Sequence, residues 1–110
     1  MKKNQFHEHI AGPDGYVTMR VHFCKRAAAE AVAAAQEANP NAKRAAQRAA
    51  AAAFVAALPP LSTAPDVQAF IACVTCGTGL GLITGTDASR YLYAAQVAIS
   101  NRRDCIAVEL

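Results

Sequence analysis

The chain has 110 residues and a formal net charge of +3, and alanine dominates a hydrophobic fraction of 54%. This length suits one small domain, 1–110, and the longest uncharged apolar stretch, residues 49–61, is too short to span a bilayer. Because no apolar leader follows Lys2 and Lys3, we expect a cytoplasmic protein whose cysteines are reduced.

The N-terminal part of the chain predicts β-structure. Residues 1–12 are polar and are expected to be flexible, and the Gly-Pro-Asp-Gly sequence of residues 12–15 is typical of a turn. Apolar and polar side chains then alternate over residues 16–23, which is the pattern of a strand with one buried face. Residues 6–10 form a candidate second strand that would complete a hairpin.

The next segment predicts two helices. Alanine, the residue with the highest helix propensity, makes up more than half of residues 27–57. Asn39 and Pro40 interrupt this run, because proline disfavours helical geometry in the residue before it. We therefore expect helices over residues 25–38 and 41–58, the second with Asn41 as its N-cap. Their small side chains predict a core built from close contacts between helices.

The C-terminal half predicts two further helices and a short strand. Thr63 is a candidate N-cap for a third helix with Pro65 in its first turn, and the glycines of residues 77–81 would end it. A fourth helix is expected from residue 86 or 87 to 101, and the alternation over residues 104–110 indicates a strand beside residues 16–23. The expected fold class is α+β, mainly α, with about four helices.

Basic residues are concentrated in the first half of the chain. Residues 1–58 carry eight Lys and Arg against four Asp and Glu, whereas residues 59–110 carry three against four. Such an asymmetry indicates an acidic partner, either nucleic acid or a protein surface, or a solvated face that keeps the helices soluble. The candidate partner-binding residues are Lys25, Arg26, Lys43, Arg44 and Arg48.

Cysteine and histidine offer a candidate metal site. Cys73 and Cys76 form a CxxC pair, and His22 and Cys24 form a second pair, so together they could supply four zinc ligands. The CxxC pair lies inside an apolar helical pattern, however, which favours cysteines that are buried as small hydrophobic residues. The segment 7–9 reads His-Glu-His and is an additional, isolated candidate.

The sequence contains no pattern that indicates catalysis. Residues 77–81 read Gly-Thr-Gly-Leu-Gly, but they follow a predicted helix, whereas a dinucleotide-binding loop lies between a strand and a helix. No serine has the glycine context of a nucleophile elbow, and no carboxylates pair on one predicted face. We expect a protein that is not an enzyme and that needs no cofactor.

Two segments carry a resemblance. Residues 66–74, DVQAFIACV, and residues 90–98, RYLYAAQVA, resemble a helix pair in small bacterial and phage proteins of mobile elements. Some proteins of this kind inhibit host defence, the anti-CRISPR proteins among them. The resemblance implies a phage-encoded inhibitor acting in the host cytoplasm, and it implies no site residues.

Two functions therefore remain open. The first is a non-enzymatic protein-binding module that blocks a bacterial protein or nucleoprotein complex, such as a CRISPR–Cas or other defence complex, by steric hindrance. The second is a small nucleic-acid-associated regulator that places the same basic residues on phosphates. The thin alanine core also makes a homodimer an expectation.

Overall fold

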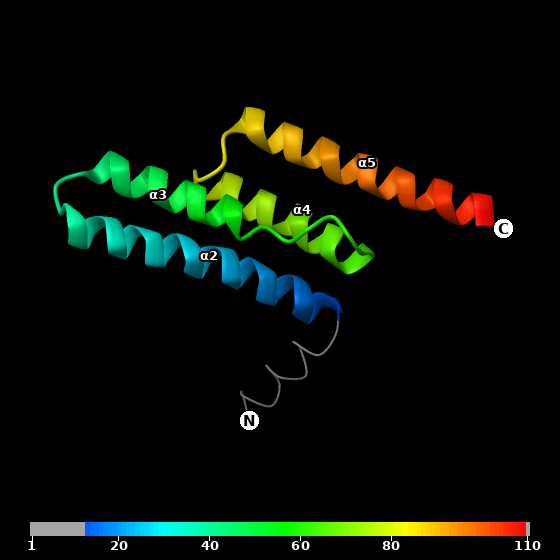
Figure 1. Cartoon of the computed structure of the whole chain (residues 1–110), viewed down its shortest axis with the longest axis horizontal. Helices are drawn as coiled ribbons and strands as arrows, with labels where there is room; N and C mark the ends of the chain where they lie inside the picture. The colour runs from blue at the N-terminus through cyan, green and yellow to red at the C-terminus, as the bar shows by residue number, and fades with distance from the viewer. Residues whose placement is uncertain (1–12, 110) are drawn as a thin grey trace, which may run out of the picture.

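The computed structural model describes the backbone of residues 13–109, and it describes side chains from residue 15 to residue 101. Four α-helices make up this part of the chain: α2 (Pro13–Ala38), α3 (Lys43–Ala56), α4 (Ala64–Gly79) and α5 (Gly85–Glu109). Helix α2 packs against both α3 and α4, and α5 packs against α4. As a result, α2 and α5 lie at opposite edges of a flat molecule that measures 19 Å along its shortest axis (Figure 1).

The predicted strand over residues 16–23 is wrong, because these residues form the first turns of α2. In the helix, Met19 and Phe23 are exposed while Val21 is half-buried, so the alternation of apolar residues does not mark one buried face. Pro13 is the first helical residue, a position where its fixed φ and missing N–H are tolerated. The partner strand expected over residues 6–10 lies outside the described residues.

The predicted C-terminal strand is also wrong, because α5 continues as a helix to Glu109. Within the part of the chain that the structure describes, every regular element is a helix, so the α+β fold class is corrected to all-α. Alternation over this short segment favours a strand, but α5 continues through it, so the local pattern does not decide the element.

The break in the alanine-rich segment is confirmed. Helix α2 ends at Ala38, and the side chain of Asn39 accepts a hydrogen bond from the backbone N–H of Asn41 at 3.2 Å. Helix α3 begins at Lys43 with Ala42 as its N-cap residue, so the expected cap at Asn41 is wrong. At the other end of α3, Arg20 of α2 donates from Nη2 to the carbonyl oxygen of Ala57 at 3.1 Å, which places a cation where helix carbonyls are unpaired.

The core lies between α2, α3 and α4. Its largest fully buried side chains are Phe54, Val74, Cys24 and Cys73. Around them the helices meet through buried alanines, as the sequence predicted. Because alanine adds little volume, neighbouring helices approach closely, and the few larger side chains fill the space that remains.

The start of α4 is fixed by a group of polar side chains. Thr63 is the N-cap, and its Oγ1 accepts a hydrogen bond from the backbone N–H of Asp66 at 3.2 Å. The Asp66 carboxylate in turn accepts hydrogen bonds from the Thr63 hydroxyl, at 2.9 Å, and from the Tyr16 hydroxyl of α2. The predicted cap is therefore confirmed, and the Tyr16–Asp66 bond joins the first turns of α2 and α4.

This hydrogen bonding predicts a loss of stability in acid. The bonds from Tyr16 and Thr63 lower the pKa of Asp66 below its ordinary value of 3.8. A carboxyl group whose pKa is lower in the folded state stabilises the fold above its unfolded pKa, and this contribution disappears as the pH falls through the folded pKa. We therefore expect the urea midpoint of the wild type to fall more steeply between about pH 5 and about pH 2 than that of Asp66→Asn.

The control for this experiment is Asp87→Asn. Asp87 occupies the first turn of α5, as Asp66 occupies the first turn of α4. The control variant should keep the acid dependence of the wild type. Equal slopes for the wild type and Asp66→Asn would show that the Tyr16–Asp66 bond does not stabilise the fold.

Candidate partner-binding surface

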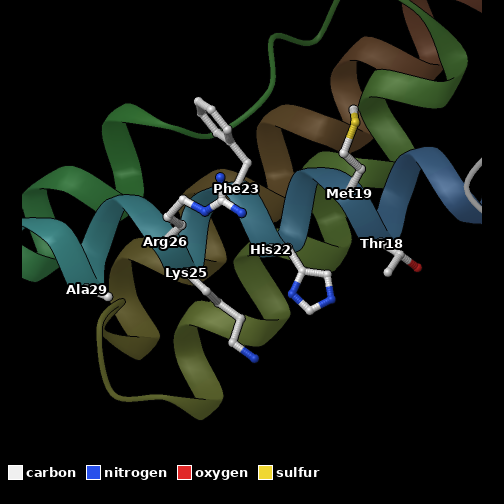
Figure 2. Close-up of a pocket in the computed structure, with 7 residues that line it drawn as sticks. All are labelled: Thr18, Met19, His22, Phe23, Lys25, Arg26 and Ala29. Carbon is white, nitrogen blue, oxygen red and sulfur yellow. The ribbon is translucent and has the colours of Figure 1, made fainter. Parts of the chain in front are cut away.

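The outer face of α2 carries a shallow groove. One side of the helix is covered by α3 and α4, and the other side is exposed from residue 19 to residue 29. The groove has a volume of about 750 Å³. We call it the α2 groove, and it is lined by Thr18, Met19, His22, Phe23, Lys25, Arg26 and Ala29 (Figure 2).

Helical periodicity arranges these side chains in two rows. Residues three and four positions apart lie on the same side of a helix. Figure 2 shows His22 and Lys25 along one edge of this exposed face, and Met19 and Phe23 along the other edge. A ligand lying along the groove would therefore contact His22 and the cation of Lys25 along one edge and apolar groups along the other.

The apolar row is unusually exposed. Met19 is 44% exposed and Phe23 is 53% exposed. The guanidinium of Arg20 lies over the Phe23 ring, 5.3 Å from its centroid, and Arg20 is itself held by its hydrogen bond to Ala57. This cation–π contact covers one face of the ring and restricts its orientation. Phe23 therefore offers one free ring face at a fixed position.

The basic residues predicted to bind a partner lie in two places. Lys25 and Arg26 line the α2 groove. Lys43, Arg44 and Arg48 are exposed on α3, where Arg44 and Arg48 line a separate shallow depression. The structure therefore does not gather the five residues into one site, and only the pair on α2 lies beside exposed apolar groups.

Sequence reasoning missed the apolar half of the α2 groove. The strand predicted over residues 16–23 places Met19 and Phe23 on its buried side, and the sequence marks His22 only as a candidate metal ligand. A helical interpretation of residues 16–29 would have found them, because residues 19, 22, 23 and 26 fall on one face at i, i+3, i+4 and i+7.

The structure brings Cys24 and Cys73 together in the core, but it places His22 apart from them. His22 is exposed in the α2 groove, whereas Cys24 is fully buried in the interface with α4. Cys73 is also fully buried and Cys76 is half-buried. Among the residues with described side chains, no three of the types His, Cys, Asp and Glu are placed to hold a metal ion. The segment 7–9 lies outside the described residues.

The buried thiols are instead part of the core. Burial raises the pKa of Cys24, and it raises the pKa of Cys73 to about 12. Both thiols are consequently protonated at neutral pH and are weak nucleophiles. This environment matches the interpretation of these cysteines as small hydrophobic residues.

The glycines after the CxxC pair end α4. Gly79 is the last residue of the helix, and Gly81 has a φ of +76°, in the left-handed region that glycine adopts without strain. The N–H groups of Leu82 and Ile83 both donate to the carbonyl oxygen of Gly77, at 2.8 and 3.2 Å. These bonds turn the chain back over the end of α4, so the segment serves as the predicted helix stop.

None of the helices that the structure describes combines the length and apolarity required to cross a bilayer. No protein-family model, curated protein or solved structure matches the chain.

Proposed function

We propose that the chain is a non-enzymatic protein-binding module, and that it holds an acidic, amphipathic segment of its partner in the α2 groove. The observation that carries this proposal is the exposure of Met19 and Phe23 beside Lys25 and Arg26 in one groove. Cations alone would suit any anionic ligand. Together with exposed apolar side chains they favour a ligand with carboxylates and an apolar anchor, such as an amphipathic helix.

Phosphate backbones fit this groove less well. A nucleic acid would use the cations, but it would leave Met19 against a polar surface. Phe23 has only one free ring face because Arg20 covers the other. A single aromatic ring with one accessible face is a poor platform for base stacking. Methionine, by contrast, adapts its shape to apolar partners and is common on protein-binding surfaces.

The proposed mechanism is steric. Lys25 and Arg26 steer association with an acidic surface, and the apolar row then anchors the complex. The helices packed behind α2 would occupy the space that the partner's own ligand needs. Inhibition of a bacterial defence complex in the cytoplasm is one role that such a blocking module could serve, and it rests on the resemblance of residues 66–74 and 90–98 alone.

The second candidate function is binding to nucleic acid through α3. Lys43, Arg44 and Arg48 are exposed on one helix with no exposed large apolar side chain among them, which suits phosphates better than a protein. This function predicts an affinity that falls steeply with salt and depends little on base sequence.

Capture from nuclease-treated bacterial lysate, with mass spectrometry of the bound proteins, tests the first function. We expect the wild type to capture a protein. Met19→Ser/Phe23→Ser should reduce the amount captured at least about tenfold, because buried apolar anchors dominate interface energies. Lys25→Glu/Arg26→Glu should reduce the amount captured to a similar extent. The control is Leu80→Ser, which removes an exposed apolar group at the C-terminal end of α4 and should leave capture unchanged.

Fluorescence anisotropy with single-stranded and double-stranded oligonucleotides tests the alternative. Tight, salt-sensitive binding that is lost in Lys43→Glu/Arg48→Glu, together with unchanged protein capture by both α2 variants, would overturn the first function in favour of the second.

A further inference from the structure

The outward face of α5 has no partner within the described chain. Helix α5 packs on α4 along one side, where Ala88 and Ala95 are buried and the ring of Tyr91 meets the ring of Phe70 edge to face, with centroids 6.0 Å apart. In contrast, α2 and α4 each pack against two helices. Helix α5 is therefore covered on one side only.

Between residues 91 and 101, the uncovered side of α5 exposes large apolar side chains beside uncharged polar ones. Tyr93 is 68% exposed, Leu92 39% and Val97 40%. Tyr93 and Val97 line a groove of about 580 Å³ together with Gln96, Ile99 and Ser100. Residues 91–101 contain no Asp, Glu, Lys, Arg or His. Enrichment in tyrosine and depletion of charge are typical of the buried centre of protein interfaces.

We propose that this face joins two copies of the chain, with their α5 helices antiparallel about a twofold axis. In a twofold interface the same patch meets itself, so a residue i that contacts residue j is matched by j contacting i. An uncharged patch satisfies this requirement without repulsion. Tyr93 of each copy would pack against Val97 of the other, because the two residues lie one helical turn apart on either side of the axis.

The α5 face is a better site for self-association than the α2 groove. Across a twofold axis, Lys25 and Arg26 of the α2 groove would face the same cations of the second copy. The α5 face has no charged side chain between residues 91 and 101, so two copies can approach there without repulsion.

Dimerisation through α5 leaves the α2 groove free. The two helices lie at opposite edges of the molecule (Figure 1), so each copy would keep its groove accessible. The dimer would then present two binding sites, and a partner with two matching segments would gain avidity. The two surfaces are separate, so the proposed dimer and the proposed function of the groove are independent, and an experiment can contradict one without contradicting the other.

Light scattering coupled to size-exclusion chromatography, with the full chain at about 100 µM, measures the expected state. The wild type should elute with twice the chain mass of 11.5 kDa. Tyr93→Glu/Val97→Glu should raise the dissociation constant at least about a hundredfold, because four carboxylates would meet around the axis. Met19→Glu/Phe23→Glu is the matched control and should stay dimeric, with far-UV circular dichroism checking that each variant is helical.

A monomeric wild type at this concentration would overturn the proposal. So would a dimer that survives Tyr93→Glu/Val97→Glu, or one that only the α2 control variant disrupts, since the interface would then lie elsewhere.

Discussion

Phe54→Ala is expected to lower the free energy of unfolding by about 3–5 kcal/mol, the usual cost of removing a buried aromatic ring. Phe54 is fully buried in α3, and it belongs to a cluster of core side chains to which all four described helices contribute. Few other large side chains are fully buried, and the alanines around the ring cannot expand into the cavity. A small domain is stable by only about 5–15 kcal/mol, so this single change should bring the protein close to unfolding at ambient temperature.

Urea unfolding followed by far-UV circular dichroism measures this effect. Tyr93→Ala is the control, because it removes an aromatic ring that is 68% exposed and should change the free energy of unfolding by less than about 1 kcal/mol in the monomer. If Phe54→Ala cost no more than the control, the cluster around Phe54 would not be the core that holds the helices together.

The sequence was sufficient to find helices where the composition agrees with the capping and helix-breaking residues at their ends. The interruption at Asn39-Pro40, the cap at Thr63 and the stop within residues 77–81 were all predicted, and each depends on a residue whose backbone or side chain allows few alternatives. These signals are local, so they can be interpreted without knowledge of the tertiary structure.

The first turns of α2 could not be predicted in the same way. Val17, Met19, Val21 and Phe23 alternate as in a strand, and β-branched and aromatic residues favour strands. Tertiary contacts favour the helix over a strand. Tyr16 donates a hydrogen bond to Asp66 of α4, Arg20 donates one at the end of α3, and Cys24 lies in the core. These three contacts recur every four residues, which is the period of a helix. Their partners lie more than 30 positions away in the chain.

The error over residues 16–23 also hid the candidate site. A strand would have buried Met19 and Phe23 together, whereas the helix exposes both beside Lys25 and Arg26. Two of the five basic residues named from the sequence lie in this groove, but charge alone could not indicate which ones. The exposure of apolar neighbours distinguishes them, and exposure depends on the fold.

Gly77→Ala is expected to lower the free energy of unfolding by about 1–3 kcal/mol, as overpacking of a core usually does. Helix propensity alone predicts the opposite sign, because alanine in a helix interior is better than glycine by up to about 1 kcal/mol. Gly77 is buried in α4, and a Cβ added there would lie 2.7 Å from both Cε1 of Phe54 and Cδ1 of Ile83. The end of Ile83 can move, but the buried ring of Phe54 cannot.

Gly79→Ala tests whether this cost is steric. Gly79 ends the same helix, and a Cβ added to it meets nothing within 4 Å, so the free energy of unfolding should stay within about 1 kcal/mol of the wild type or rise slightly. In a double-mutant cycle, Phe54→Leu should reduce the cost of Gly77→Ala, because the smaller side chain makes room for the new methyl group. Equal costs in both backgrounds, or a stabilised Gly77→Ala variant, would mean that Phe54 and Gly77 are not in close contact.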